Sequence, residues 1–207
     1  VEAVHRGRTI FANIRKSVLF MLCTNVAEVA AVSVAAFAGW TLPLRPLQIL
    51  YLNMLTDVFP ALALAVGVGT GTEMSRPPRD ASEPILTRRH WAAIGGWAAL
   101  IAACMLGAMH FATAGLGIGE RGAVTVSFLT LGFSKLWFTL NLRDRRSGLI
   151  KNEIVLNPWY WGAVVLCSGL LAASVYYPAL AQVLETRALP GEGWTLVLAA
   201  SLVPLVV

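Results

Sequence analysis

Long apolar blocks separated by short polar stretches dominate this chain. The hydrophobic positions run on for about 20 residues at a time, without the alternation of period two that marks membrane strands. A helix of about 20 apolar residues crosses a hydrocarbon core of about 30 Å, and its backbone satisfies its own hydrogen bonds there. The pattern therefore predicts an all-α fold, a polytopic membrane bundle of six transmembrane helices. The predicted spans cover residues 17–39, 44–66, 91–113, 121–141, 158–181 and 193–207.

Composition agrees with a membrane protein. Of the 207 residues, 57% are hydrophobic and 13% are charged, whereas about a quarter are charged in a typical soluble domain. We divide the chain into the start of a cytoplasmic stalk helix, 1–16, and a six-helix domain, 17–207. The last predicted span has about 15 residues and is about 22 Å long, too short to cross. We therefore expect the chain to be part of a larger protein.

The distribution of basic residues predicts an orientation. Most lie on the side of the N-terminus: Arg6, Arg8, Arg15, Lys16, Arg76, Arg79, Arg88, Arg89, Arg143, Arg145, Arg146 and Lys151. The opposite side carries Arg45, Arg121 and Arg187. The positive-inside rule then predicts an integral, multi-pass protein with both termini in the cytoplasm. The basic residues form separate clusters next to the membrane without interleaved aromatic residues, so we expect the lipid bilayer and not nucleic acid as a partner.

Two neighbouring spans carry polar side chains at mid-membrane depth. Asn25 and Glu28 are three residues apart in the first span, and Asn53, Thr56 and Asp57 share one face of the second. An ionised carboxylate in the membrane is costly unless it has a partner, so such residues indicate function. The alternative is that these groups form hydrogen bonds between helices and only stabilise the bundle.

Pro60 modifies the second of these faces. A proline has no N–H, so the carbonyl of Thr56, four residues earlier, loses its helical partner. We expect a helix break beside the site, with a free carbonyl near Asp57. Carboxylate, amide, hydroxyl and carbonyl oxygens are the ligands that Ca²⁺ prefers. Cys23, Cys104 and Cys167 lie within spans and lack a paired motif, so we interpret them as packing residues, with a soft-metal role as the alternative.

Three segments carry a resemblance to a known family. They are "GRTIFANIRKSVLFMLCTNVAEV", "PLQILYLNMLTDVFPALALAV" and "MSRPPRDASEPIL". They resemble, in order and spacing, the C-terminal membrane domain of type II P-type cation-transporting ATPases, the group that includes the sarco/endoplasmic reticulum Ca²⁺-ATPase. The resemblance implies that the six spans correspond to helices five to ten of a ten-helix pump.

The resemblance also implies roles for single residues. Asn25 and Glu28 fall on cation-binding positions of the fifth helix, and Asn53, Thr56 and Asp57 on those of the sixth. Related sodium and proton/potassium pumps tend to carry an acid at the position of Asn53, so its amide favours Ca²⁺ or Mn²⁺ as the transported ion.

The resemblance implies further partners in a parent ATPase. These are the first four helices and the actuator, nucleotide and phosphorylation domains. ATP and Mg²⁺ would bind only there, because these 207 residues contain neither an Asp-Lys-Thr-Gly motif nor a Gly-rich phosphate loop. The chain by itself therefore lacks the catalytic residues of an ATP hydrolase and would supply about half of the ion site.

Lys135 departs from the family pattern. In "LTLGFSKLWFTLNLRD" it stands about where two-site calcium pumps carry a coordinating Glu. A protonated lysine cannot bind a cation, but its ammonium group can occupy the space of a second ion and pair with Glu28 or Asp57. The alternative is that Lys135 extends to the cytoplasmic interface.

Taken together, these features predict the cation-translocating domain of an ATP-driven pump, with Ca²⁺ or Mn²⁺ as its ion. One alternative is a secondary transporter or channel in which Glu28, Asp57 and Lys135 relay protons. A second is a membrane scaffold or gene remnant that transports nothing, for which Glu28→Gln would have no effect.

Overall fold

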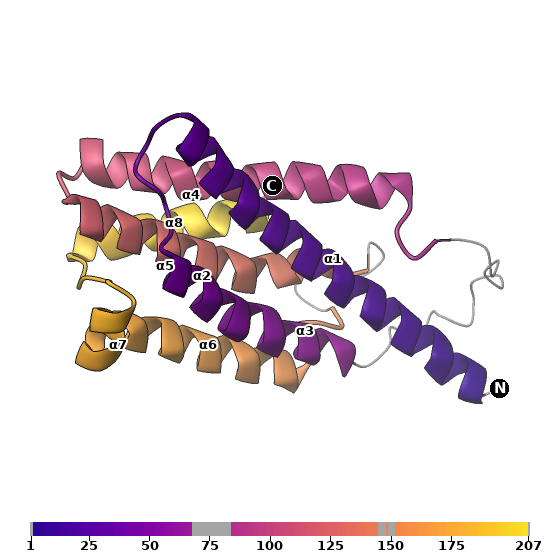
Figure 1. Cartoon of the computed structure of the whole chain (residues 1–207). Helices are drawn as coiled ribbons and strands as arrows, with labels where there is room; N and C mark the ends of the chain where they lie inside the picture. Colours follow the sequence, from indigo (N-terminus) through magenta and orange to yellow (C-terminus); the bar gives the residue numbers. More distant parts are fainter. Residues whose placement is uncertain (1, 68–83, 145–147, 149–151, 207) are drawn as a thin grey trace.

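A computed structural model describes residues 2–67, 84–144, 148 and 152–206 (Figure 1). All regular secondary structure in these residues is helical. Seven helical rods follow one another along the chain: α1 (Glu2–Phe37); α2 (Pro46–Leu52), which continues through a π-helix (Asn53–Asp57) into α3 (Val58–Ala65); α4 (Arg88–Ala114); α5 (Glu120–Phe138), extended by a 3-10 turn (Thr139–Leu142); α6 (Pro158–Tyr176); α7 (Pro178–Val183); and α8 (Gly191–Val206).

Five of these rods are long and apolar enough to cross a membrane, which confirms the all-α prediction. They are α1, the continuous rod Pro46–Ala65, α4, the rod Glu120–Leu142 and α6. The sixth predicted span coincides with α8, which is apolar but has 16 residues.

The fifth predicted span, 158–181, is too long. Helix α6 ends at Tyr176, because Pro178 restricts the residue before it to an extended conformation. Tyr177 has φ −84° and ψ 115°. The short helix α7 then begins at Pro178, where the missing N–H of proline has no helical partner to lose.

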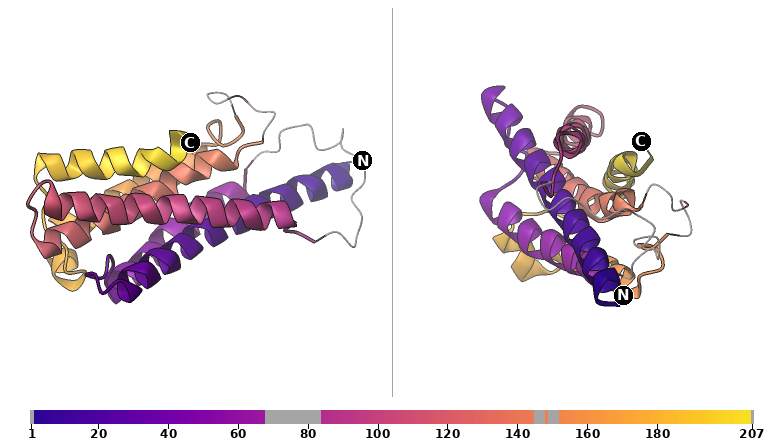
Figure 2. Two further views of the ribbon diagram at one scale, coloured as in Figure 1. Left: turned by 90° about the horizontal axis from the view of Figure 1, so that it is seen from above. Right: turned by 90° about the vertical axis from the view of Figure 1, so that its right-hand side faces the viewer.

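Helix α5 forms the centre of the bundle. Its apolar window is 89% buried, against 39% for α1, α4 and α6. The end-on view of Figure 2 shows α5 between α4, α8 and the α2–α3 rod. Every side chain from Ala123 to Leu136 is buried. A polar side chain in this part of α5 therefore points into the protein interior, whatever direction it takes.

Residues 2–16 of the predicted stalk segment belong to helix α1, which continues without interruption to Phe37. Its N-terminal end extends past the other helices (Figures 1 and 2). The ends of α3 and the starts of α4 and α6 lie at the same end of the bundle. Five of the predicted cytoplasmic basic residues, and the "RPPRD" segment, lie outside the described residues: Arg76, Arg79, Arg145, Arg146 and Lys151.

Candidate ion-binding site

The backbone around the polar face of the second span departs from α-helical geometry. Residues Asn53–Asp57 form a π-helix, in which each turn is wider than in an α-helix. The chain does not unwind at Pro60, which lies inside α3. Since Pro60 has no N–H to donate to Thr56, a widened turn on its N-terminal side redistributes the hydrogen bonds of this segment. Single π turns of this kind occur frequently at functional sites.

Lys135 lies at the centre of the site. Its Nζ atom is 3.1 Å from Glu28 Oε2 on α1 and 3.0 Å from Asp57 Oδ1 in the π-helix. It is also 3.2 Å from Asn53 Oδ1. The three donors of the ammonium group thus meet three oxygen acceptors, which offsets the penalty of burying the charge. The side chain of Lys135 is fully buried, so it does not extend to an interface. We call Glu28, Asn53, Asp57 and Lys135 the lysine cluster.

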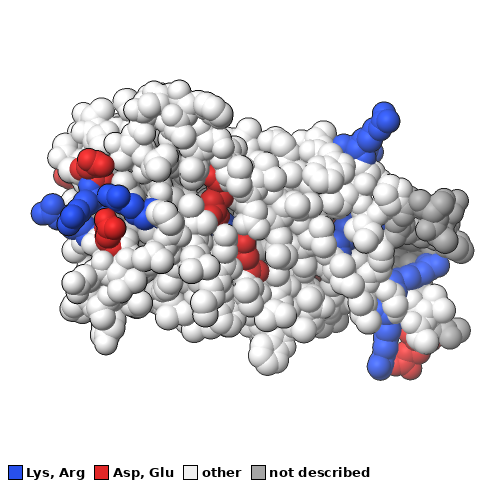
Figure 3. All heavy atoms as spheres, viewed as in Figure 1, with Lys and Arg blue, Asp and Glu red and all other residues white. Residues whose placement is uncertain are grey.

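With both carboxylates ionised, the lysine cluster carries one net negative charge, because two carboxylates face one ammonium group. Both carboxylates are almost completely buried, with Glu28 and Asp57 each 4% exposed. Figure 3 shows charged atoms at mid-length of the bundle, well separated from the charged residues at its two ends. A residual negative charge in a dry environment attracts a cation strongly.

The other predicted ligands take different positions. The hydroxyl of Thr56 donates to the carbonyl of Leu52, 2.8 Å away in its own helix. The Oδ1 atom of Asn25 is buried and has no hydrogen-bond partner among the described residues. Within the same residues, no three His, Cys, Asp or Glu side chains gather as a metal site. The described helices therefore bring together two carboxylates and one amide, with Lys135 between them.

Helix α6 supports the π-helix through contacts that the sequence analysis did not identify. The thiol of Cys167 donates to the carbonyl of Leu55, 3.4 Å away, within the π-helix. One turn before it, the hydroxyl of Tyr51 donates to the carbonyl of Leu170, 2.8 Å away. Neither contact has a local sequence signal, because each joins residues more than 100 positions apart.

Three side chains donate hydrogen bonds at the C-terminal end of α3. Asn13 donates to Gly67 O at 2.7 Å, and Ser17 donates to Ala61 O at 3.0 Å. Asn157 donates to Ala63 O at 2.7 Å and accepts from the N–H of Trp159, as the N-cap of α6. The bond to Ala63 O satisfies a carbonyl that the helix end leaves free. The Asn-Pro pair before α6 is a sequence signal of a helix start that the sequence analysis left unused.

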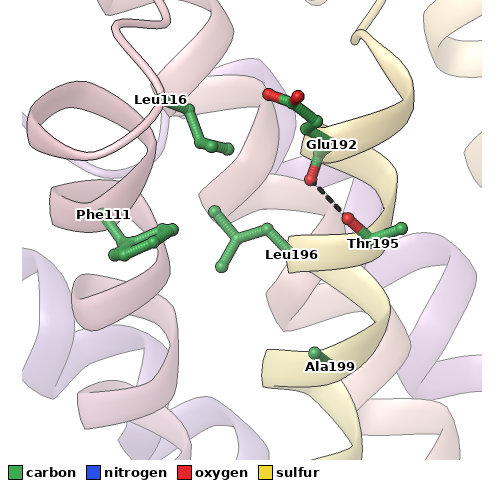
Figure 4. Close-up of a pocket in the computed structure, with 6 residues that line it drawn as sticks. All are labelled: Phe111, Leu116, Glu192, Thr195, Leu196 and Ala199. Atoms are coloured by element: carbon green, nitrogen blue, oxygen red, sulfur yellow. Dashed lines mark hydrogen bonds between the residues drawn. The ribbon is translucent and has the colours of Figure 1, made fainter.

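A pocket of about 320 Å³ lies between α4 and α8, away from the lysine cluster (Figure 4). Phe111 and Leu116 line it on the α4 side. On the α8 side it is lined by Glu192, Thr195, Leu196 and Ala199. The hydroxyl of Thr195 donates to the carbonyl of Glu192 in the same helix. The pocket contains no member of the lysine cluster.

A bundle of apolar rods of spanning length, packed around a buried charged cluster, is typical of an integral, multi-pass membrane transport protein. Residues 41–207 match the family model described as cation transporting ATPase, C-terminus. The chain belongs to this family and forms a membrane domain of a P-type cation ATPase.

Similar proteins agree with this assignment. The chain is 32% identical over 223 residues to calcium-transporting ATPase 1 of Bacillus cereus, covering 100% of the chain and 25% of that protein. It is 31% identical over 209 residues to the calcium-transporting ATPase of Bacillus subtilis, covering 98% of the chain and 23% of that protein. A shorter match, 47% identical over 91 residues, joins 44% of the chain to 7% of the P-type sodium-transporting ATPase4 of Plasmodium falciparum. The chain thus spans about a quarter of the length of the two bacterial relatives.

Proposed function

We propose that this domain translocates Ca²⁺, or Mn²⁺, through the site formed by Glu28, Asn53 and Asp57, in a pump driven by ATP. The observation that carries the proposal is the lysine cluster, which holds two buried carboxylates and an amide oxygen at mid-length of the bundle. Carboxylate and amide oxygens are preferred ligands of Ca²⁺. The bacterial relatives that match the whole chain, named as calcium-transporting ATPases, support the choice of ion.

The site needs further ligands, since Ca²⁺ takes six to eight oxygens. The unpaired Oδ1 of Asn25 is one candidate, and a turn of the backbone or side chain would bring Thr56 to the ion. The remaining ligands would come from the first four helices of the parent, of which the fourth supplies carbonyls and a Glu in the related pumps. In this proposal the domain has six membrane helices with both termini cytoplasmic, and α8 belongs to the sixth.

Lys135 limits the number of ions. Two divalent ions would bring four positive charges, whereas Glu28, Asp57 and one acid from the fourth helix bring three negative charges. The ammonium group of Lys135 removes one of these, so one divalent ion leaves the site close to neutral. A second ion would leave a large buried excess of positive charge. We therefore propose one divalent cation per transport cycle.

ATP hydrolysis would take place in the parent's nucleotide and phosphorylation domains. Helix α1 carries Glu28 and extends beyond the bundle at the end where those domains would lie. A movement of this helix would reach the site directly, because Glu28 is one of the partners of Lys135.

The same cluster supports a second candidate function, a proton relay in a secondary transporter or channel. Flux measurements with the full-length parent, purified and reconstituted into vesicles, separate the two. The pump predicts Ca²⁺ uptake that requires ATP and is lost in Glu28→Gln, while Glu120→Gln, at the exposed start of α5, behaves as the wild type. Ion flux in the absence of ATP that is sensitive to Glu28→Gln would favour the relay.

A further inference from the structure

Gly132 occupies a crowded junction between three helices. It lies on α5, one turn before Lys135. A Cβ atom at this position would lie 2.9 and 3.0 Å from the two δ carbons of Leu171 on α6, and 3.2 Å from Cδ2 of Leu52 on α2. At 2.9 Å a Cβ atom would be closer to Leu171 than real Cβ atoms lie to their neighbours, and at 3.0 and 3.2 Å the leucines would have to give by a few tenths of an ångström. Both leucines are fully buried, so neither can swing its side chain out into open space.

The junction therefore sets how closely α5 approaches α2. Leu52 is the last residue of α2 and directly precedes the π-helix that holds Asn53 and Asp57. The three contacts of Lys135 Nζ lie between 3.0 and 3.2 Å. These are hydrogen bonds of ordinary length, and a few tenths of an ångström of separation would weaken all of them.

We propose that Gly132 is a positioning residue for Lys135. Its missing side chain lets Leu52 and Leu171 pack against the α5 backbone, and this close packing holds the ammonium group between Glu28 and Asp57. In this way Gly132 would set how strongly Lys135 neutralises the carboxylates, and hence the cation affinity of the site. The inference rests on the proposed function for its consequence in transport, but the packing relationship can be measured without it.

A merely structural glycine would behave differently. Alanine favours a helix more than glycine does, so Gly→Ala is stabilising wherever the new methyl group has space. Gly107 on α4 is the matched control, because a Cβ there meets nothing within 4 Å. At Gly132 the added methyl group has to push α5 away from α2 and α6, and overpacking of this kind shifts the backbone.

The test uses the full-length parent with the variants Gly132→Ala, Lys135→Gln, their combination, Gly107→Ala and Leu171→Val. The first readout is the Ca²⁺ concentration for half-maximal phosphorylation from ATP. Lys135→Gln removes the competing charge and should lower this concentration about tenfold. Gly132→Ala should lower it about threefold, and adding it to Lys135→Gln should change nothing further. Leu171→Val removes the two δ carbons that a Cβ at Gly132 would meet. Combined with Gly132→Ala, it should return the Ca²⁺ concentration for half-maximal phosphorylation to the wild-type value.

The second readout is the melting temperature in detergent without Ca²⁺, which does not depend on transport. We expect Gly132→Ala to lower the melting temperature and Gly107→Ala to leave it unchanged or raise it. The effects of Gly132→Ala and Lys135→Gln on the melting temperature should be non-additive.

Additive effects in both readouts, or a Gly132→Ala protein that behaves like Gly107→Ala, would overturn the positioning role. A wild-type parent without Ca²⁺-dependent phosphorylation would overturn the proposed function instead, and non-additive melting temperatures would still support the packing relationship. If Gly132→Ala alone does not accumulate, Gly132→Ala with Leu171→Val is compared with Leu171→Val in the same way.

Discussion

The Nζ atom of Lys135 lies 3.0 Å from Oδ1 of Asp57, although 78 residues separate them along the chain. The pairing places a positive charge inside a site whose other polar groups are suited to binding cations. Glu28, on a third helix, completes the ion pair. A cation bound at this site would therefore meet carboxylates that Lys135 already partly neutralises.

Orientation is the first testable consequence of the charge distribution. Single cysteines placed in the segments 67–90 and 143–157, in a background without reactive thiols, should be labelled from the same side as the N-terminus. The physical reason is the excess of Lys and Arg at that end of the spans. A cysteine at Thr41, in the loop between the first two spans, is the control for the opposite side. Labelling of either segment together with Thr41 would contradict the six-span arrangement.

The positions of the five long helices were predictable, because apolar runs of spanning length are a local property of the sequence. The end of α6 was also encoded, at Pro178, but the apolar pattern continued past it. The direction of the Lys135 side chain was not predictable, since it depends on α1, α5 and the π-helix meeting in space. Pro60 indicated a missing hydrogen bond, but not whether the segment before it would unwind or widen into a π-helix.

Asp57 should be essential for coupling the cation to ATP. Asp57→Asn keeps the size of the side chain but removes the charge that offsets the desolvation of the cation. We expect it to abolish cation-dependent phosphorylation of the full-length parent by ATP, while phosphorylation of Glu192→Gln, an exposed acid at the start of α8, stays unchanged. Wild-type cation dependence in Asp57→Asn would give Asp57 a structural role only.

Asn157 should contribute to the stability of the bundle through two bonds at once. Asn157→Ala removes the N-cap of α6 and the donor to Ala63 O, which should lower the free energy of unfolding by about 1–3 kcal/mol. Asn157→Asp keeps the cap and loses only the donor, so its melting temperature in detergent should lie between those of Asn157→Ala and the wild type. Equal melting temperatures for all three proteins would show that neither bond of Asn157 contributes to stability.

Cys167 should affect the site through the π-helix. Cys167→Ala removes the donor to Leu55 O, so the segment that holds Asn53 and Asp57 loses one of its supports on α6. The Ca²⁺ concentration for half-maximal phosphorylation should then rise about threefold, roughly the effect of one weak hydrogen bond. Cys167→Ser keeps a donor and should stay close to the wild type, as should Cys104→Ala on α4. A Cys167→Ala protein with unchanged affinity would mean that the contact with Leu55 does not support the site.

The most direct measurement is the number of Ca²⁺ ions bound at equilibrium to the full-length pump, wild type and Lys135→Glu. In the proposed pump, the fully buried ammonium group of Lys135, in contact with Glu28 and Asp57, takes the place and the charge of a second ion. The wild type should therefore bind one Ca²⁺ per molecule. Lys135→Glu reverses the charge and adds two oxygens, so it should gain a second site. Two bound ions in the wild type would contradict the account.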